Sequence, residues 1–210
     1  MLKPDYSLYL VSNRDVLMHG ETLESAVEKA ILGGVSFVQL REKNISFLEF
    51  YNLALKIKKI TDYYKVPFII NDRIDVALAV DADGVHVGQD DMPLNIARKL
   101  LGENKIIGVS AHNVEEAQIA EQNGANYLGV GAIWRSNHTK KDAEIVGAET
   151  LKEICKNVSI PVVAIGGINR DNIKDLKNTG ISGVAMVSAI LHNDDITSAT
   201  KDLIKEVKKI

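Results

Sequence analysis

Two cationic side chains and one amide stand at the end of an apolar segment, 37–40, at spacings that suit anion binding. Arg41 and Lys43 alternate along an extended stretch and Gln39 shares their parity, so all three side chains project to the same side. The guanidinium fork and the ammonium group both suit phosphate oxygens. A surface strip of ion pairs, formed with Glu42 and distant acids, is the alternative interpretation.

Two carboxylates follow the next two apolar segments, Asp72 after 67–70 and Asp91 after 84–87. Neighbouring carboxylates repel each other unless a cation or a shared proton lies between them. Mg²⁺ is typically held by one or two carboxylates together with substrate phosphate oxygens and water. One Mg²⁺ bound to a pyrophosphate accounts for both signs of charge. By chemistry alone Asp90 competes with Asp91, and Asp72 and Asp91 also stand where they could cap the helices that follow.

A second anion site is predicted later in the chain. Gly166 and Gly167 let backbone N–H groups approach a phosphate closely, and Val187 and Ser188 stand at the corresponding position after another apolar segment. A simple tight turn is the alternative interpretation of the two glycines. With two anions at one site, the sequence predicts two phosphorylated small-molecule substrates, or one bisphosphate that spans the site.

Short apolar segments that alternate with longer amphipathic ones must position these side chains. Such alternation is typical of parallel strands covered by helices. Eight strands are predicted, at Leu8–Val11, Phe37–Leu40, Pro67–Ile70, Gly84–Val87, Ile106–Val109, Tyr127–Val130, Pro161–Ile165 and Gly183–Val187. Helical patterns fall near 22–32, 47–64, 73–80, 94–101, 113–123, 148–157, 170–178 and 194–208. The count predicts a single α/β domain over 1–210, a closed (β/α)₈ TIM barrel.

An open doubly wound sheet is the alternative architecture. Against it, Ser12-Asn13-Arg14-Asp15 follows the first strand in place of a Gly-x-Gly-x-x-Gly motif. Polar groups also cluster at the carboxyl ends of the predicted strands, whereas glycines and small residues mark the other ends. A barrel carries its active site at those carboxyl ends, often with a phosphate site after strands seven and eight. This sorting by strand direction favours an enzyme site at the barrel mouth.

Composition excludes several classes of protein. A net charge of −3 gives no reason to expect nucleic acid or an anionic membrane as a partner. A lone Cys155 in a helical pattern predicts a buried, inert thiol. No segment approaches about 18 uninterrupted apolar residues, so we expect a cytoplasmic protein. The sequence leaves open whether the chain forms a homo-oligomer.

The histidines lack the spacing of metal ligands. His86 and His112 stand at strand ends, where oriented packing or a hydrogen bond to substrate is expected instead of zinc binding. His19 and His192 are interpreted as solvated loop residues.

Six motifs in a fixed order carry a resemblance to a known family. They are Gln39-Leu40-Arg41-Glu42-Lys43, Ile70-Asn71-Asp72-Arg73, Gly84-Val85-His86-Val87-Gly88-Gln89-Asp90-Asp91, Gly108-Val109-Ser110-Ala111-His112, Thr139-Lys140-Lys141-Asp142 and Ala164-Ile165-Gly166-Gly167-Ile168. In these motifs the sequence resembles thiamine phosphate synthase, over nearly its whole length. That family joins hydroxymethylpyrimidine pyrophosphate to thiazole phosphate, giving thiamine phosphate and pyrophosphate.

The resemblance assigns roles to the motif residues. It implies that the pyrimidine pyrophosphate contacts Gln39, Leu40, Arg41, Glu42, Lys43, Asn71, Ser110 and Lys140, of which Arg41, Lys43, Ser110 and Lys140 are catalytic. It implies one Mg²⁺ per active site, held by Asp72 and Asp91, and so selects Asp91 over Asp90. It implies a thiazole phosphate site made by Gly167, Val187 and Ser188 with Asn137, His138 and Thr139. The loop from Ala132 to Lys140 is one residue longer than in relatives, and it lacks the proline and the first threonine of their usual Pro-Thr-x-Thr-Lys.

The resemblance also implies a dissociative mechanism without a protein nucleophile. Mg²⁺, Arg41, Lys43 and Lys140 would stabilise charge on the leaving pyrophosphate, and orientation of the two substrates would supply much of the rate. Two alternative functions are a thiazole tautomerase-type isomerase and a noncatalytic phosphate-ligand binding barrel. Members of the tautomerase type tend to lose the metal carboxylates, so the presence of Asp72 and Asp91 argues against that alternative.

Overall fold

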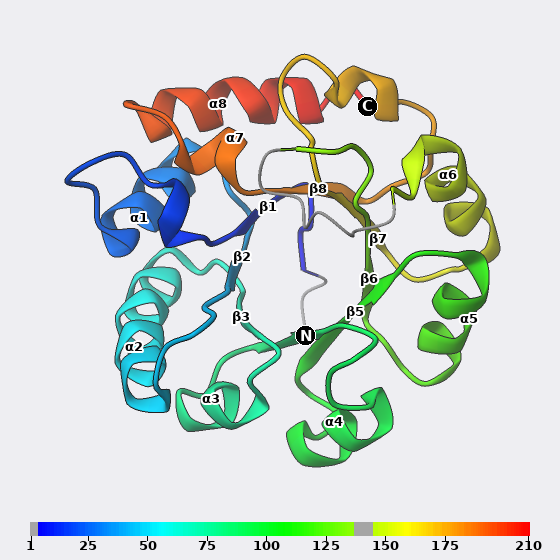
Figure 1. The fold of residues 1–210 in the computed structure, drawn as a ribbon, viewed down its shortest axis with the longest axis horizontal. Helices are drawn as coiled ribbons and strands as arrows, with labels where there is room; N and C mark the ends of the chain where they lie inside the picture. The colour runs from blue at the N-terminus through cyan, green and yellow to red at the C-terminus, as the bar shows by residue number, and fades with distance from the viewer. Residues whose placement is uncertain (1–3, 137–144) are drawn as a thin grey trace.

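The computed structural model describes residues 4–136 and 145–210, and its strands form one closed parallel barrel (Figure 1). Each strand pairs with the next one, and β8 pairs back with β1. In chain order the strands are β1 (Leu8–Val11), β2 (Phe37–Leu40), β3 (Phe68–Asn71), β4 (Gly84–Val87), β5 (Ile106–Ala111), β6 (Tyr127–Val130), β7 (Val162–Ile165) and β8 (Gly183–Met186). The predicted TIM barrel is confirmed, and no predicted strand end is wrong by more than two residues.

Helices form a ring around the outside of the barrel (Figure 1). They are α1 (Leu23–Gly33), α2 (Phe47–Tyr64), α3 (Ile74–Ala79), α4 (Leu94–Leu101), α5 (Val114–Gln122), α6 (Gly147–Asn157), α7 (Ser188–Leu191) and α8 (Ile196–Val207), with 3₁₀ turns η1 (Arg14–Val16) and η2 (Ile173–Leu176). The first and last long helices, α1 and α8, lie side by side. A Cβ on Gly33 would stand 2.4 Å from the Cβ of Thr200, so glycine permits this close packing.

Local sequence explains why the helices begin and end where they do. Ser46 and Glu49 form a reciprocal capping box at the start of α2, and Lys65 ends this helix with a left-handed φ of 57°. Thr22 caps the start of α1 by accepting a backbone hydrogen bond, and Gly34 ends it with φ 117°. Thr22 and Ser46 thereby mark the ends of loops on the mouth side of the barrel, whereas Gly34 and Lys65 mark the beginnings of loops on the opposite side.

The apolar core has two shells because successive strand side chains point to opposite faces. The larger shell lies between strands and helices and contains residues such as Leu10, Leu40 and Ile70. The smaller shell fills the barrel interior and is rich in aromatic rings. It is made by Tyr6, Tyr9, Val11, Phe37, Ile69, Ile106, Tyr127, Val163 and Ala185. The rings of Tyr9 and Phe37 lie 4.7 Å apart, and those of Tyr6 and Tyr127 4.8 Å apart, so the interior is a packed core and not a pore.

One predicted helix, 170–178, is wrong in kind. The structure has only the 3₁₀ turn η2 there, and its N-cap residue Asn172 makes no side-chain capping bond to it. Asn178 and Gly180 both have positive φ, 63° and 91°, which stops further winding. The predicted helix 194–208 is confirmed as α8, and the short helix α7 before it was not predicted.

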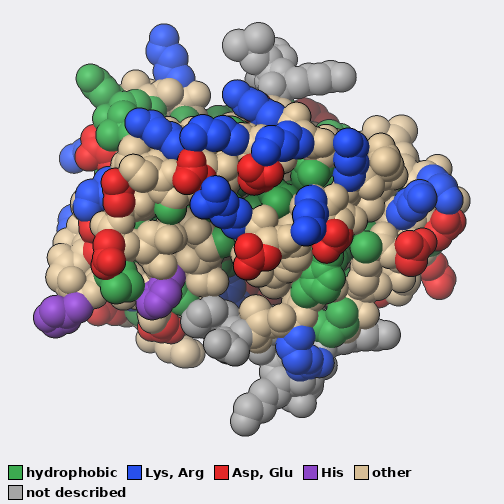
Figure 2. Space-filling model, turned by 90° about the horizontal axis from the view of Figure 1, so that it is seen from above, with side chains coloured by type: hydrophobic (Ala, Val, Ile, Leu, Met, Phe, Trp, Pro, Cys, Tyr) green, Lys and Arg blue, Asp and Glu red, His purple; other side chains and the backbone are tan. Residues whose placement is uncertain are grey.

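On the face seen in Figure 2, Lys and Arg side chains are interspersed with Asp and Glu, so this face is not dominated by one sign of charge. None of the helices in the described part of the chain combines the length and apolar content that a bilayer span requires.

Candidate active site

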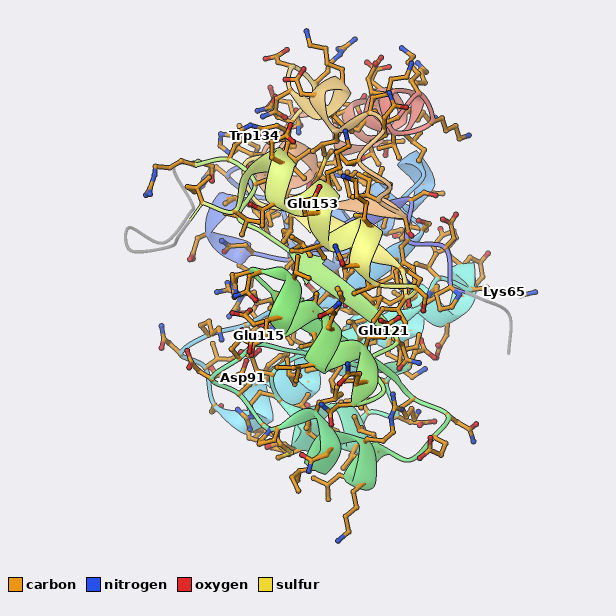
Figure 3. All side chains as sticks on the ribbon, turned by 90° about the vertical axis from the view of Figure 1, so that its right-hand side faces the viewer. Lys65, Asp91, Glu115, Glu121, Trp134 and Glu153 are labelled. Carbon is orange, nitrogen blue, oxygen red and sulfur yellow. The ribbon has the colours of Figure 1, made fainter. Side chains whose placement is uncertain are left out.

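The predicted site residues gather at the carboxyl ends of the strands. Figure 3 shows Asp91 and Trp134 at this end of the barrel and Lys65 at the opposite end. Two cavities lie at this mouth. The outer cavity, of about 830 Å³, is lined mainly by residues that follow β1, β6, β7 and β8, and the inner cavity, of about 160 Å³, by side chains within the barrel. Arg41 and Ile165 line both cavities, so the two spaces are neighbours.

A chain of buried hydrogen bonds crosses the wall of the inner cavity. Gln39 Nε2 donates to the Tyr9 hydroxyl at 2.5 Å, and this hydroxyl lies 2.8 Å from the hydroxyl of Tyr127. His86 Nδ1 lies 2.8 Å from the same Tyr127 hydroxyl, and His86 Nε2 lies 3.0 Å from Ser110 Oγ. The predicted residues Gln39 and Ser110 are thereby joined through three side chains of the barrel core.

Every member of this chain is neutral near pH 7. Burial raises the pKa of both phenols, Tyr9 and Tyr127, above the ordinary value. Burial also lowers the pKa of His86 from 6.5 to about 4, against a smaller opposing effect of the negative charge on Asp91. Both ring nitrogens of His86 are hydrogen-bonded within the barrel, and its side chain lines the inner cavity. His112 pairs instead with Glu116, at 2.8 Å.

The buried neutral His86 predicts a stability that falls with acidity. The unfolded chain binds a proton at this side chain below pH 6.5, whereas the folded chain binds one only near pH 4. The free energy of unfolding should therefore decrease between pH 6.5 and pH 4, by about 3 kcal/mol from this residue. Urea unfolding of the wild type and of His86→Gln across this range measures the difference. Equal slopes for the two proteins would contradict the prediction.

Asp72 and Asp91 meet at the rim of the barrel. Lys43 Nζ pairs with Asp72 Oδ2, and Asn71 Nδ2 donates to Asp72 Oδ1 at 2.6 Å. The carboxyl group of Asp91 lies close enough to Asp72 to affect its pKa, and it accepts the Gly88 N–H at 2.7 Å. Burial raises the pKa of Asp72, the Lys43 ammonium opposes this, and the adjacent Asp91 raises the pKa further. The site thus holds two carboxyl groups at the cost of mutual repulsion.

Helix capping does not explain these two carboxylates. The N-cap residues of α3 and α4 are Arg73 and Pro93, and neither helix has a side-chain capping bond. Asp72 itself has a left-handed φ of 59°, which is uncommon for a residue with a side chain. The backbone strain and the raised pKa of Asp72 are both typical of a functional position.

Arg41 brings a positive charge to the boundary between the cavities. Its backbone is held by Ser12, whose hydroxyl accepts the Arg41 N–H at 2.8 Å and donates to the Arg41 carbonyl at 3.3 Å. Within residues 4–136 and 145–210, its guanidinium has neither an ion pair nor a hydrogen bond. Lys43 pairs with Asp72, an acid distant in sequence, as the ion-pair alternative expects for that cation, whereas Arg41 has no such pair within the described residues.

Three of the predicted contact side chains in the described residues do not line the two cavities: Lys43, which pairs with Asp72 at the rim, and Leu40 and Glu42, which lie away from both cavities. Leu40 is fully buried in the shell between strands and helices. Glu42 pairs with Arg14 at 2.7 Å, its side chain is 6% exposed, and its Oε1 has no hydrogen-bond partner in the described residues. Neither side chain lines the inner or the outer cavity. Glu42 Oε2 holds Arg14 beside the mouth.

The outer cavity contains the predicted glycine-lined site. Gly166, Gly167, Val187 and Ser188 all line it. Gly167 has φ 69°, and a Cβ there would stand 2.4 Å from the backbone oxygen of Trp134, so only glycine fits between the two loops. The predicted residues of β7 and β8 are therefore together, as the barrel topology requires.

Several residues at the mouth escaped the sequence analysis. Asn13 and Asn169 line the outer cavity, and so does His192, whose Nδ1 bonds to the Val16 carbonyl at 2.9 Å. The interpretation of His192 as a purely solvated loop residue is therefore incomplete, although the side chain is exposed. Polar residues directly after a strand, as Asn13 is, were the available signal. The predicted contacts Asn137, His138, Thr139 and Lys140 lie outside the described residues.

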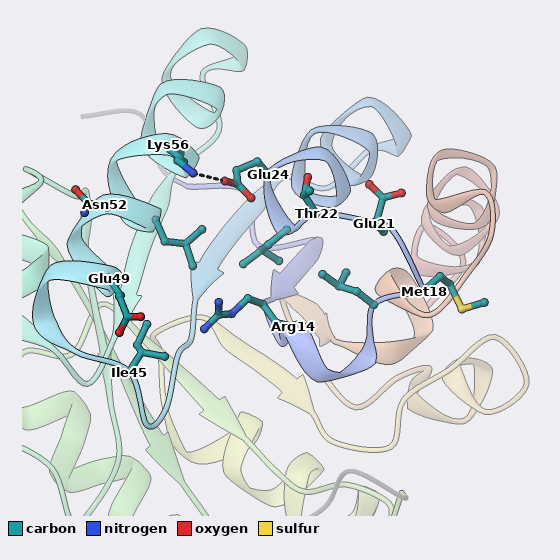
Figure 4. Close-up of a pocket in the computed structure, with 12 residues that line it drawn as sticks. Arg14, Met18, Glu21, Thr22, Glu24, Ile45, Glu49, Asn52 and Lys56 are labelled. Carbon is teal, nitrogen blue, oxygen red and sulfur yellow. Dashed lines mark hydrogen bonds and ion pairs between the residues drawn. The ribbon is translucent and has the colours of Figure 1, made fainter.

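A separate cavity of about 590 Å³ lies between η1, α1 and α2 (Figure 4). Its charged groups are already paired: Lys56 Nζ lies 3.0 Å from a carboxylate oxygen of Glu24, as the dashed line shows, and Glu21 pairs with Lys29 at 2.6 Å. Glu49 is used in the capping box of α2. This cavity therefore does not resemble the charged, partly unpaired mouth of the barrel.

A family model and several known proteins are similar to this chain over most of its length. The family model for thiamine monophosphate synthase matches residues 8–190. The thiamine-phosphate synthase of Clostridium beijerinckii is 59% identical over 208 residues, which cover 99% of each chain. That of Clostridium tetani is 56% identical over 199 residues, 95% of this chain and 94% of the relative.

Solved structures agree as well. A thiamine phosphate pyrophosphorylase from Pyrococcus furiosus superposes with a TM-score of 0.90 and 39% identity, covering 100% of this chain and 98% of the other. A geranylgeranylglyceryl phosphate synthase from Thermoplasma acidophilum, at TM-score 0.71 and 14% identity, shares the fold alone. With a family match over most of the chain and relatives above 50% identity, the chain belongs to the thiamine monophosphate synthase family.

Proposed function

We propose that the chain is a Mg²⁺-dependent transferase that joins hydroxymethylpyrimidine pyrophosphate to thiazole phosphate and releases thiamine phosphate and pyrophosphate. One observation carries the proposal. Lys43 and the neighbouring carboxyls Asp72 and Asp91 stand at the same barrel mouth as a glycine-lined cavity. Arg41, which has no ion pair in the part of the chain that the structure describes, lies at the boundary of the two cavities. A metal-bound pyrophosphate and a second phosphate together match this distribution of charge.

The rim residues fit a divalent cation. Asp72 and Asp91 offer hard oxygen ligands that repel each other without a cation, and this repulsion adds to the larger effect of burial in raising the pKa of Asp72. Two carboxylates completed by substrate oxygens and water are a typical Mg²⁺ site. When bound, the ion would neutralise charge on the pyrophosphate.

The chain's own residues bind and orient the first substrate. Lys43 and Arg41 would hold pyrophosphate oxygens and stabilise the negative charge that grows as the bond from the pyrimidine methylene carbon to oxygen breaks. Lys140, which the family resemblance adds, would do the same. Gln39 and Ser110 would orient the pyrimidine ring in the inner cavity, where Tyr9 and His86 support them.

The second substrate completes the reaction from the outer cavity. The backbone around Gly167 and the hydroxyl of Ser188 would hold its phosphate. The pyrophosphate would leave first, with the electron pair of the broken bond, and the thiazole nitrogen would then donate an electron pair to the methylene carbon of the resulting pyrimidine cation. No protein nucleophile or general base is needed, so orientation by the two adjacent cavities supplies much of the rate.

A direct assay tests the proposal. The purified protein is mixed with both substrates, with Mg²⁺ or with EDTA, and thiamine phosphate and pyrophosphate are quantified. We expect equal amounts of the two products with Mg²⁺ and none with EDTA. Conversion of a single thiazole substrate without pyrophosphate release would indicate an isomerase, and binding without any conversion would indicate a noncatalytic barrel.

Gly167→Ala tests the outer cavity. The new Cβ would clash with the Trp134 carbonyl, and alanine is strained at the positive φ of this position, so the loop after β7 must move. We expect the KM for thiazole phosphate to rise about tenfold or more, and the free energy of unfolding to fall by about 1–2 kcal/mol. Gly124→Ala is the matched control, because Gly124 has φ 88° but no neighbour within 4 Å. This control should lose stability from strain and keep its KM. An unchanged KM in Gly167→Ala would count against the site.

A further inference from the structure

The hydrogen-bonded chain between Gln39 and Ser110 is built into the barrel. Gly129 leaves room for the His86 ring, since a Cβ there would stand 2.8 Å from His86 Cε1. Gly108 likewise leaves room for Tyr127, whose Cζ would lie 2.1 Å from a Cβ at that position. Small residues on β5 and β6 thus admit two large polar side chains, and the packing fixes where their hydrogen-bonding atoms lie.

Counting protons gives this chain a direction. The Tyr9 oxygen accepts from Gln39, and its other partner in the described residues is the Tyr127 oxygen, so the Tyr9 proton belongs in that bond. The Tyr127 proton then points to His86 Nδ1. His86 therefore carries its proton on Nε2 and donates it to Ser110 Oγ. In the opposite direction Gln39 and Tyr127 would both donate to the Tyr9 oxygen, and the Tyr9 proton would have no acceptor within the described residues, which is costly for a buried group.

We propose that Tyr9, Tyr127 and His86 are positioning residues that fix the polarity of two substrate contacts at once. The bond to Tyr9 uses one N–H of the Gln39 amide and fixes the orientation of the amide, so that its oxygen remains an acceptor for a ligand in the inner cavity. At the other end His86 Nε2–H donates to Ser110 Oγ, which leaves the hydroxyl proton of Ser110 available to a ligand. The backbone of Ser110 is held from the loop after β4, because Gln89 Nε2 donates to its carbonyl at 2.6 Å.

The polarity of the two hydrogen-bonding groups selects the chemistry of the ligand. The identity of that ligand as the pyrimidine substrate rests on the proposed function. A ring that presents an N–H donor to Gln39 and a lone-pair acceptor to Ser110 satisfies both groups. An aminopyrimidine carries an exocyclic N–H donor and ring-nitrogen acceptors, whereas a pyrimidine with a carbonyl in place of the amino group presents an acceptor to the Gln39 oxygen. The hydrogen-bond chain therefore contributes discrimination against the oxo analogue of the first substrate.

Tyr127→Phe breaks the chain at its centre. The variant keeps the ring and removes the oxygen that joins Tyr9 to His86. We expect the KM for the pyrimidine substrate to rise about tenfold, the value of one hydrogen bond, with the KM for thiazole phosphate unchanged. Tyr6→Phe is the matched control: Tyr6 packs 4.8 Å from Tyr127, and its hydroxyl makes no hydrogen bond within the described residues. An effect of Tyr6→Phe equal to that of Tyr127→Phe would overturn the proposal.

Two substitutions of His86 separate positioning from packing. His86→Gln places an amide N–H near the position of Nε2 and should retain the donor to Ser110. His86→Asn is too short to reach Ser110, so we expect it to raise the pyrimidine KM about tenfold while His86→Gln rescues it. Equal defects in both variants would mean that His86 acts only by filling space, and would overturn the proposal.

A spectroscopic test needs no substrate. Protein labelled with ¹⁵N-histidine reports the tautomer of each imidazole, and the spectrum of His86→Asn assigns the signal of His86. We expect the Nε2–H tautomer at pH 7 in the wild type; an Nδ1–H tautomer or an imidazolium would overturn the proposal. If the wild type made no thiamine phosphate, the proposed function would fail, but this spectrum would still decide the direction of the chain.

Discussion

Replacing Asp72 with asparagine is expected to lower kcat by about 100-fold or more, even at saturating Mg²⁺. Asparagine keeps the size of the side chain and the acceptor for Asn71, but it removes one of two anionic metal ligands. A metal contributes several kcal/mol of stabilisation to charge in the transition state, and about 2.7 kcal/mol corresponds to 100-fold in rate. Steady-state kinetics across a Mg²⁺ titration measures the effect, and near-normal turnover at high Mg²⁺ would refute the metal assignment.

The same variant should not be less stable than the wild type. The pKa of Asp72 is higher in the folded protein than its ordinary value, so ionisation of this carboxyl at neutral pH costs folding free energy. Asparagine removes that cost, and the free energy of unfolding without metal should stay equal or rise. Asp90→Asn is the matched control, because Asp90 is exposed and adjoins Asp91. It should keep activity within about twofold, since surface changes of this kind are usually small in effect.

Replacing Arg41 with alanine is the second substitution with a large expected effect, a loss of about 100-fold in kcat/KM for the pyrimidine substrate. A charge-assisted hydrogen bond contributes about 1.5–3 kcal/mol, and the guanidinium can make two in parallel with one phosphate. Arg41→Lys should recover part of the activity, because lysine supplies the charge without the fork. Initial rates at varied substrate concentrations measure both variants.

The stability of Arg41→Ala should stay close to that of the wild type. The guanidinium makes no ion pair within the described residues, so its removal breaks no such contact. Arg170→Ala is the control for the loss of a mouth-side arginine. Arg170 is exposed in the loop after β7 and pairs with Asp202 at 3.7 Å. If Arg41→Ala and Arg170→Ala reduced activity equally, a general electrostatic effect would explain the loss and the specific contact would be wrong.

The barrel could be predicted because its periodic signal is local and repeated. Each strand is a short apolar run followed by an amphipathic stretch, and eight such units close the sheet without any long-range information. The segment 170–178 failed because its apolar spacing resembles a helix, whereas Asn178 and Gly180 turn the backbone to positive φ. Local backbone preferences won over hydrophobic periodicity there.

The site was predictable only in part. Arg41, Lys43, Asp72 and Asp91 were visible because charged residues stand directly after apolar strands. The supporting tyrosines were not, since Tyr9 and Tyr127 lie within apolar runs, 118 positions apart, and a hydroxyl in such a run gives no sign of its partner. Leu40 lies away from the cavities because its position in the strand turns its side chain to the outer shell. Glu42 lies away from them because it pairs with Arg14, a residue that the fold brings close.

The aromatic side chains inside the barrel determine from which side a ligand can enter and leave the inner cavity. Tyr6, Phe37 and the ring of Tyr127 close the interior on the side where the strands begin. The inner cavity is therefore reached only from the mouth side of the barrel, next to the outer cavity, within the part of the chain that the structure describes. On the proposed function, we expect the pyrimidine substrate to enter the inner cavity before the thiazole phosphate occupies the outer one, and both products to leave through the barrel mouth.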